Sequence, residues 1–419
     1  MKGVFVVLDG VADEPSRILR DATPLERADT PNLNRLVSSS SIEQCRVVRK
    51  GIAPESSSAI LSLLGYEPFS VSRGPLEALG AGIKVSRGDL VLRTNFATVD
   101  DIKSRRLLDR RAGRTLGTND ARILVRAVNE QVKLPYLFRF YPTIQHRGVV
   151  VFRGGFSDNI SNVDPHYSGG AVSSAEEIVP FSNPLDDEQD SKLASDLINM
   201  FVRKSFEVLD VHPLNLARAK KGLYSANFIL CRDAGCEIPR LPKLKGSWMA
   251  LTYMPLETGI ARAAKMDVHT FAYPPLHGID VYENLYSGLA LAVKEAVRAL
   301  SRHAAHYDYF FVHFKETDIP GHDNKPLDKV KMIEFLDQRF FSFLLPFIEK
   351  HRARVVVTAD HTTSCRLKAH TDAPVPVLFY NPSALLSHSG RFTENFASNG
   401  RMLSGKSLLD KTIFLCHER

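Results

Sequence analysis

Three short apolar runs stand out along the chain, and each one ends in polar or charged residues. The runs are VFVVL at 4–8, YDYFFVHFK at 307–315 and RVVVTAD at 354–360. Continuous apolar runs of this length are typical of strands that are buried on both faces of a parallel sheet. Residues 285–306 and 328–351, on either side of the second run, carry apolar positions at helical spacing. This alternation predicts an α/β fold with a doubly wound, mainly parallel sheet.

The middle of the chain has a different pattern. Its apolar runs are shorter, as in VVVFRG and NFILCR, and an acidic stretch, PLDDEQDSK, lies between them. A basic stretch with two prolines, PRLPKLKGS, follows and is typical of a linker. We therefore expect a discontinuous core domain at 1–75 and 246–419, and a smaller α+β domain inserted at 76–245. Near the N-terminus, TPNLNRLVSSS predicts a helix that Thr30 caps, with Pro31 in its first turn.

Composition narrows the function without deciding it. The chain has 419 residues, of which 44% are hydrophobic and 24% charged, as in an ordinary globular protein with room for two domains. Its net charge of +7 suits a small anionic substrate, and no nucleic-acid-reading motif accompanies the charge. Five cysteines without a CxxC pair argue against disulfides and zinc ribbons. No stretch approaches twenty apolar residues. We expect a cytoplasmic protein that binds neither nucleic acid nor a membrane; its oligomeric state stays open.

Candidate metal ligands lie where the predicted strands end. In an open α/β sheet, ligands bind at the carboxyl ends of the strands. The residues expected there are Asp9, Glu316, Asp318, Asp360 and His361.

Spacing suggests two metal sites rather than one. Asp318 and His322 are four apart in TDIPGHD, so either one helical face or a tight loop at Pro320 and Gly321 can bring them together. Asp360 and His361 are adjacent on an expected strand and should point in different directions, which favours separate ions. His370 follows in KAHTDAPVPV. This mixture of oxygen and imidazole ligands fits two Mn²⁺ or Zn²⁺ ions that clamp a phosphoryl group.

A nucleophile for phosphoryl transfer is available in IAPESSSAILSLLGY, where hydroxyls precede an apolar helical run. A serine at a helix N-terminus lies among unpaired N–H groups that stabilise a phosphate. Ser56, Ser57 and Ser58 all satisfy this argument, and any of them could instead only cap the helix.

The order of motifs resembles one family over nearly the whole chain. The first predicted strand is followed by Asp9 and Gly10. After them come, in order, TPNLNRL, PESSSAILSLLGYEP, RGPLEALGAG, DRRAGR, HRGVVVFRG, DPH, GHD, TADHTTSC and KAHTDAPVPV. This series resembles the archaeal type of cofactor-independent phosphoglycerate mutase, of the alkaline phosphatase superfamily.

That resemblance implies a serine nucleophile, Ser56, which takes the phosphate of 3-phosphoglycerate and returns it to the 2-hydroxyl. It implies two divalent ions and no 2,3-bisphosphoglycerate. We expect Mn²⁺, with Zn²⁺, Mg²⁺ or Co²⁺ as alternatives. One ion would be held by Asp9, Ser56, Asp360 and His361, and the other by Asp318, His322 and His370.

The inserted domain would then hold the glycerate. Its carboxylate and hydroxyls require bidentate donors and a base, which LLDRRAGR offers. Asp109 is the candidate for the proton transfers. The expected substrate ligands, largely by resemblance, are Arg110, Arg111, Arg114, Arg147, Asp164, His166 and Arg232.

The chain departs from the family pattern at several positions. The usual PGSDTAH is PESSSAI here, so that Glu55, Ser57 and Ile60 replace Gly, Asp and His, and Asp233 stands where a Gly is usual. Glu55 would repel a phosphorylated serine and would restrict a turn that needs a positive φ angle. The usual lysine is missing from HGIDVYENLYSG, and Lys265 could replace it. Two alternatives therefore accompany the mutase: a diverged phosphomonoesterase, and a catalytically weak paralogue with a binding role.

Overall fold

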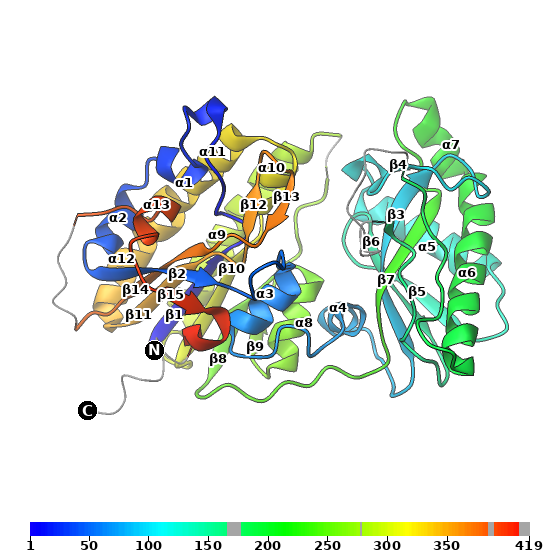
Figure 1. The fold of residues 1–419 in the computed structure, drawn as a ribbon, viewed down its shortest axis with the longest axis horizontal. Coiled ribbons are helices and arrows are strands. Elements are labelled where there is room, and N and C mark those ends of the chain that lie inside the picture. Colours follow the sequence, from blue (N-terminus) through cyan, green and yellow to red (C-terminus); the bar gives the residue numbers. More distant parts are fainter. Residues whose placement is uncertain (166–176, 277–278, 384–388, 410–419) are drawn as a thin grey trace.

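The computed structural model describes residues 1–165, 177–276, 279–383 and 389–409. His166, one of the expected substrate ligands, lies outside these residues. Figure 1 shows two sheets side by side, the first built from both ends of the chain and the second from its middle.

The first sheet has eight strands in the order β15-β2-β14-β11-β1-β10-β8-β9. Only β14 among them runs antiparallel to its neighbours β11 and β2. The strands are β1 (Gly3–Leu8), β2 (Ser40–Arg46), β8 (Trp248–Leu251), β9 (Asp267–His269), β10 (Tyr309–Phe314), β11 (Arg354–Thr358), β14 (Val375–Tyr380) and β15 (Met402–Ser404). The predicted mainly parallel α/β sheet is confirmed.

Strand β1 lies between β11 and β10 and is parallel to both. Every residue of β1 and β10 is buried, as their unbroken apolar runs predict. Leu8 pairs with Phe314, and Val7 pairs with Thr358. The three carboxyl ends therefore lie at one edge of the sheet, where the polar residues that follow each strand meet.

Helices form two groups about this sheet, on either side of its strands in Figure 1. One group comprises α2 (Pro31–Val37), α9 (Val281–His303), α11 (Pro326–Leu336) and α12 (Ser342–His351), and the other comprises α3 (Ser56–Leu63) and α8 (Pro255–Ala263). Among the described residues, the core also contains α1 (Pro24–Arg27), α10 (Asp318–His322) and α13 (Glu394–Ala397), and a two-stranded sheet joins β12 (Thr362–Ser364) to β13 (Ala369–Thr371).

Helix α2 begins where the sequence predicts, but its expected cap is wrong. The Thr30 side chain makes no capping hydrogen bond. Instead the Asp337 carboxylate accepts the N–H groups of Asn32, at 3.2 Å, and Leu33, at 2.7 Å. Asp337 lies in a π-helical turn, Asp337–Phe341, that joins α11 to α12. The helix N-terminus is thus satisfied by a residue 304 positions away from Leu33, which local sequence cannot reveal.

The second sheet is antiparallel, with the order β4-β3-β6-β5 and with β7 paired to β3. Its strands are β3 (Leu90–Val99), β4 (Leu107–Asp109), β5 (Phe138–Pro142), β6 (Arg147–Phe152) and β7 (Phe228–Gly235). Helices α5 (Thr118–Gln131) and α6 (Gln189–Asp210) pack on it, and α7 (Pro213–Lys220) packs on α6. These strands all lie within the expected insert, although its boundaries at 76 and 245 stay a prediction.

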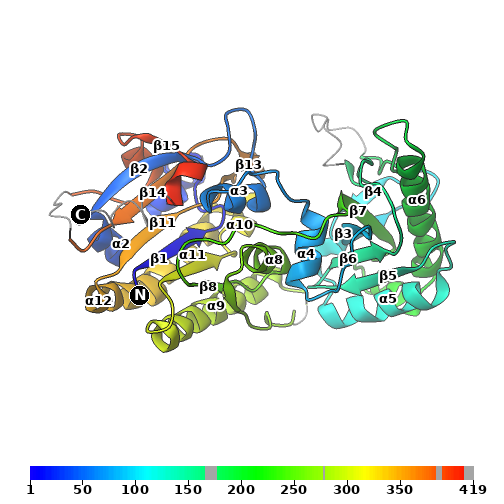
Figure 2. The same ribbon diagram turned by 90° about the horizontal axis from the view of Figure 1, so that it is seen from below.

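Helix α4 (Arg73–Gly80) lies between the two sheets, beside α8 (Figure 2). The two helices touch through glycines: a Cβ at Gly80 would lie 1.6 Å from the Pro255 carbonyl oxygen, and one at Gly259 would lie 1.8 Å from that of Leu76. At its other end, a Cβ at Gly74 would lie 2.5 Å from the Val91 carbonyl oxygen in β3. Backbone-to-backbone packing therefore fixes α4 against helix α8 on one side and against the second sheet on the other.

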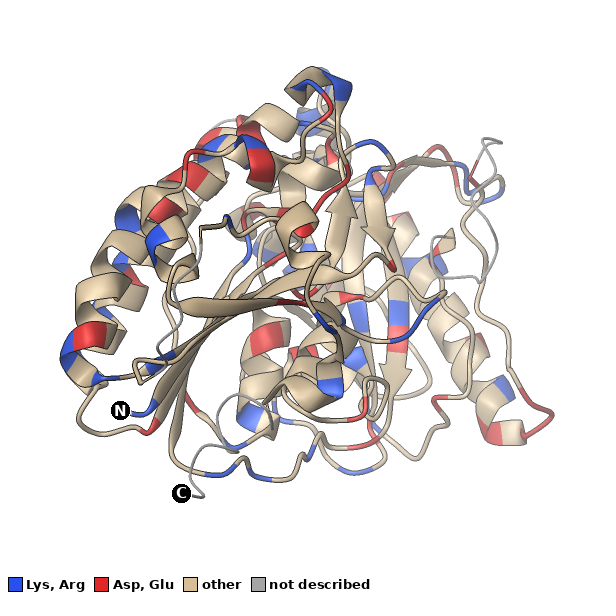
Figure 3. Ribbon diagram, turned by 60° about the vertical axis from the view of Figure 1, so that its left-hand side comes forward, with Lys and Arg blue, Asp and Glu red and all other residues tan. Residues whose placement is uncertain are grey.

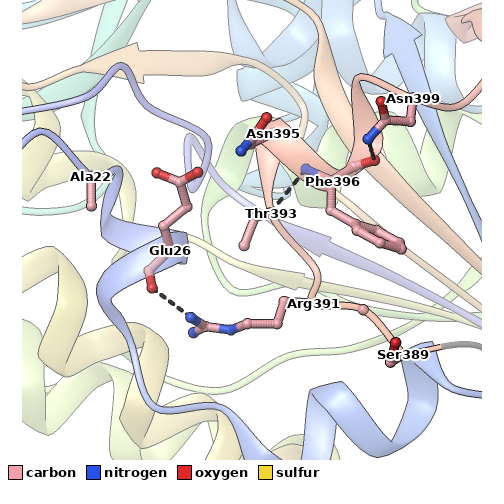
Figure 4. A pocket seen from close by; sticks show the side chains of 9 residues that line it. Ala22, Glu26, Ser389, Arg391, Thr393, Asn395, Phe396 and Asn399 are labelled. Carbon is pink, nitrogen blue, oxygen red and sulfur yellow. Dashed lines mark hydrogen bonds between the residues drawn. The ribbon is translucent and has the colours of Figure 1, made fainter.

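The surface gives little indication of a partner. Basic and acidic residues are mixed along the outer helices (Figure 3), as the modest net charge suggests. Within the described part of the chain, no helix is long and apolar enough to cross a membrane. A hollow of about 730 Å³ lies near α1 and α13, where Arg391 donates to the carbonyl of Glu26 (Figure 4). It contains none of the predicted site residues.

Candidate metal centre and nucleophile

Asp9, Asp360 and His361 form one group of candidate metal ligands at the carboxyl ends of β1 and β11. His361 Nε2 lies 3.2 Å from Asp360 Oδ2 and 3.5 Å from Asp9 Oδ1, and all three residues are almost fully buried. Among the described residues, Asp9 Oδ1 and Asp360 Oδ2 have no hydrogen-bond partner. Burial and the neighbouring His370 lower the pKa of His361 to about 3, which keeps the imidazole in the neutral form that binds metals. Two buried carboxylates with unpaired oxygens beside a neutral imidazole fit a divalent cation.

The expectation that Asp360 and His361 point apart is wrong. Both follow the end of β11 at Thr358 and lie in a turn, so the alternation of side chains along a strand does not apply to them. The turn directs both into the same group.

Asp318, His322 and His370 form the second group. Asp318 and His322 begin and end the helical turn α10, so the helical alternative is the one adopted. His322 Nε2 lies 3.3 Å from Asp318 Oδ2, and His370 Nε2 lies 3.5 Å from Asp318 Oδ1. The opposite ring nitrogens contact backbone carbonyls, His322 Nδ1 that of Lys368 at 3.0 Å and His370 Nδ1 that of Pro54 at 2.8 Å.

These carbonyl contacts aim both Nε2 atoms at the Asp318 carboxylate, the arrangement typical of metal-binding histidines. The two groups are adjacent, because the His361 and His370 rings stack with their centroids 3.7 Å apart. The Thr363 hydroxyl also joins them, lying 2.9 Å from His361 Nδ1 and 2.8 Å from Asp318 Oδ1.

Ser56 is the serine that faces these groups. It is the first residue of α3, and its Oγ lies 3.3 Å from His361 Nε2. Glu55 occupies the N-cap position without a side-chain capping bond, and the Ser58 hydroxyl donates to the Glu55 carbonyl at 2.9 Å. The Ser56 hydroxyl thus contacts a candidate metal ligand, whereas the Ser58 hydroxyl bonds to the backbone. The spacing of the three serines alone did not distinguish between these two.

Lys315 is a residue at this centre that the sequence reasoning missed. It follows β10, and its Nζ contacts the Asp9 carboxylate, lies 3.0 Å from Glu257 Oε1 and lies 3.3 Å from Ser56 Oγ. Burial alone would lower the pKa of Lys315, but Asp9 and Glu257 outweigh it and raise the pKa, so the ammonium stays charged. A signal was present, because Lys315 directly follows the same apolar run that precedes Asp318.

Lys265 does not share this position. It follows the C-terminal end of α8, where it is exposed and has a φ angle of 59°. Glu257, near the N-terminal end of the same helix, is the residue that reaches Lys315. Helix α8 ends at Ala263, so Lys265 lies beyond the end of the helix that is far from Glu257.

The second sheet contributes a cluster of arginines. Asp164 accepts two bonds from Arg110, at 3.1 and 2.7 Å, and one from Arg232 at 2.7 Å. Asp109 Oδ1 accepts the N–H groups of Arg111 and Gly113, both at 2.7 Å, and so fixes the DRRAGR turn. Burial, followed by repulsion from the other arginines, lowers the pKa of Arg111 to about 9.

Two of the arginines contact the core. Arg114 donates to both oxygens of Asp323, at 2.7 Å each, and Asp323 directly follows His322. Arg147 lies 3.8 Å from the Met254 sulfur, immediately before α8. Arg114 and Arg147 therefore lie where the second domain meets the core, and Arg114 lies beside the segment that follows His322.

Comparison with known proteins identifies the family. Residues 38–215 match the family model described as 2,3-bisphosphoglycerate-independent phosphoglycerate mutase. A protein of that name from Aeropyrum pernix is 38% identical over 441 residues, which cover 99% of each chain. This chain belongs to the 2,3-bisphosphoglycerate-independent phosphoglycerate mutases. The mutase of that name from Thermococcus kodakarensis is 36% identical over 95% of this chain and 93% of its own.

Two solved structures share the fold of this chain, and one of them carries the name of a mutase. The PH0037 protein of Pyrococcus horikoshii superposes with a TM-score of 0.74 at 28% identity, covering 98% of this mutase and 96% of its own chain. The cofactor-independent phosphoglycerate mutase of Thermoplasma acidophilum gives a TM-score of 0.56 at 28% identity, with 98% of both chains covered. The resemblance predicted from the motifs is confirmed.

The departures from the family pattern now have positions in this mutase. Glu55 has a φ angle of −85°, so this turn does not need a positive φ angle and the backbone of Glu55 is not restricted by it. Asp233 does adopt a left-handed backbone, with a φ angle of 56°. Ile60 is fully buried in the core, and Ser57 is almost as buried.

Proposed function

We propose that this chain interconverts 3-phosphoglycerate and 2-phosphoglycerate through a phosphoserine at Ser56. The observation that carries the proposal is the position of Ser56 Oγ, which lies 3.3 Å from both His361 Nε2 and Lys315 Nζ at the start of α3. In the first step, Oγ loses its proton and bonds to phosphorus as the bond between phosphorus and O3 of the substrate breaks, and O3 gains a proton. In the second step, O2 of the glycerate loses its proton and takes the phosphoryl group, and Oγ is protonated again.

The chain's own groups favour a phosphate on Ser56. The first N–H groups of α3 have no partner within the helix and point toward an anion at its N-terminus. The charged Lys315 ammonium adds a cation that Asp9 and Glu257 hold in place. Charge that is fixed before the reaction stabilises the transition state without reorganisation.

We assign two divalent ions to the two ligand groups. One ion would be held by Asp9, Ser56, Asp360 and His361. The other ion would be held by Asp318, His322 and His370. Carboxylate and imidazole ligands support Mn²⁺, and they also accept Zn²⁺, Co²⁺ or Mg²⁺. When bound, the ions would supply Lewis-acid charge that offsets the negative charge on the phosphoryl oxygens.

The second sheet would hold the glycerate between the two steps. The proposed ligands of its carboxylate and hydroxyls are Arg110, Arg111, Arg114, Arg147, Asp164, His166 and Arg232. Asp109 uses Oδ1 for its two backbone bonds, and we propose Oδ2 as the atom that exchanges protons with the glycerate hydroxyls.

The thiols of Cys45, Cys231, Cys236 and Cys365 are unpaired, which supports a cytoplasmic location.

An enolase-coupled assay with Mn²⁺ tests the proposal. We expect 2-phosphoglycerate to form from 3-phosphoglycerate, and Ser56→Ala to lower the rate by more than about 10³-fold. Ser57→Ala, one residue further along α3, is the matched control and should resemble the parent.

Two other outcomes would contradict the proposal. Release of inorganic phosphate without isomerisation would indicate the phosphomonoesterase, and neither activity despite bound metal would leave a binding role. Metal content after Mn²⁺ loading gives an independent check, because fewer than about one ion per chain contradicts the two-ion assignment.

A further inference from the structure

A row of alternating charges joins the nucleophile to the substrate arginines. Glu55 Oε2 lies 3.0 Å from an Arg73 nitrogen, and Arg73 Nε lies 3.7 Å from Asp233 Oδ2. Asp233 Oδ2 in turn lies 3.5 Å from Arg232 Nε. The row continues through Asp164, which Arg232 contacts at 2.7 Å. Opposite charges thus alternate from the residue before Ser56 to the cluster that is proposed to hold the glycerate.

Both acids next to Arg73 adjoin residues of the proposed site. Glu55 directly precedes the nucleophile Ser56, and Asp233 directly follows the proposed glycerate ligand Arg232. Two carboxylates that would each repel an anionic substrate therefore occur together, on opposite sides of one arginine. Arg73 offsets one of these two negative charges and Arg232 also contacts Asp233, so the added negative charge does not oppose the substrate in full.

The backbone of Asp233 gives an independent reason to look for a role of its side chain. Its φ angle of 56° lies in the left-handed region, which glycine adopts without strain and a residue with a Cβ does not. The side chain is only 17% exposed. Glycine adopts this conformation more readily than Asp233 does, so the side chain is retained here together with its contacts to Arg73 and Arg232.

Arg73 is held on a rigid element. It begins α4, which is packed backbone to backbone against α8 through Gly80 and against β3 through Gly74. Its side chain is 13% exposed, so its position is set by packing rather than by solvent. A contact with Arg73 from either side consequently fixes the segment that makes the contact.

We propose that Glu55 and Asp233 are positioning residues that, through Arg73, fix Ser56 relative to Arg232. Glu55, Arg73 and Asp233 are called the acid–arginine bridge below. The inference rests on the proposed function and concerns the interval in which the phosphate is on Ser56. With the bridge intact, the glycerate stays aligned and its hydroxyl attacks phosphorus. With the bridge broken, water attacks instead, so that an O–P bond from water forms, the Oγ–P bond breaks, and inorganic phosphate and free glycerate leave.

The test measures the ratio of inorganic phosphate released to 2-phosphoglycerate formed by the Mn²⁺-loaded chain. We expect Glu55→Gln and Asp233→Gly each to raise this ratio roughly fivefold, the size expected for a partly exposed ion pair. The double variant should resemble either single variant, because both changes break the same bridge. Glu67→Gln is the matched control, since it removes the exposed ion pair of Glu67 with Lys406 away from the site, and its ratio should equal that of the parent.

Thermal unfolding separates positioning from a merely structural role. Asp233→Gly relieves backbone strain, so its Tm should equal or exceed that of the parent while its phosphate release rises. An unchanged ratio in both single variants overturns the inference, and so does an additive rise in the double variant. Failure of the proposed function is distinguishable, because it would appear as transfer that survives Ser56→Ala.

Discussion

Lys329 is a fully buried ammonium behind the metal-ligand groups, and its removal should destabilise the core strongly. It extends from α11 and donates to Asp13 Oδ2 at 2.9 Å, to the Thr363 carbonyl at 2.9 Å and to the Ala12 carbonyl at 3.2 Å. Asp13 and Ala12 belong to the segment after Asp9. Thr363 belongs to the segment after Asp360. One side chain therefore joins the two loops that present the ligands.

Lys329→Met keeps the length of the side chain and removes its charge, leaving the buried Asp13 carboxylate without its ion-pair partner. Removing one member of a buried pair costs about 3–5 kcal/mol. For a unit of this size each 1 kcal/mol lowers Tm by about 2–4 °C, so the expected fall is about 10 °C. The measurement is calorimetric unfolding in the presence of a chelator, so that metal binding does not contribute.

Lys331→Met is the matched control for this variant, because Lys331 is an exposed lysine two residues further along α11. Its effect should be within about 0.5 kcal/mol. In Lys329→Met/Asp13→Asn the unpaired carboxylate is also removed, so the double variant should lose less stability than the two single changes added together. A fall in Tm of less than about 2 °C for Lys329→Met would show that the ammonium does not stabilise the loops.

Three further predictions follow from the site and the packing. Lys315→Met should lower the mutase kcat by about 10²–10³-fold, because it removes fixed charge beside Ser56, whereas the exposed Lys265→Met should not; equal rates would refute the proposed role. Gly259→Ala places a Cβ 1.8 Å from a carbonyl oxygen of α4 and should cost about 1–3 kcal/mol of stability, measured by thermal unfolding against Gly117→Ala, which meets no atom within 4 Å. Burial raises the pKa of Glu394 from 4.5 to about 7, so its contribution to stability is fully present below pH 4.5 and is lost as the pH rises through about 7. Glu394→Gln should therefore flatten the dependence of Tm on pH between about pH 5 and pH 8, and an unchanged slope would contradict the assignment.

The sequence predicted the main sheet because its signal is local. The apolar runs at 4–8 and 354–360 are each long enough to make a buried strand, and the structure contains both in adjacent positions. The same reasoning failed at Asp360 and His361, because it extended the strand past Thr358 and so applied side-chain alternation to a turn. It also assigned the cap of α2 to the nearest hydroxyl, although a carboxylate from another helix makes the hydrogen bonds.

Hydrophobic pattern and motif order by themselves determined the mainly parallel sheet, the edge at which its polar residues gather and the family to which the chain belongs. Tertiary structure alone decided which charges meet there. Lys315 reaches Asp9 across 306 positions and Lys329 reaches Asp13 across 316. The apolar run before Lys315 indicates the edge of the sheet at which it lies, but the local sequence does not identify the partner of either lysine. Burial is a property that each strand carries in its own composition, whereas an ion pair exists only once packing has brought two distant side chains within a few ångströms of each other.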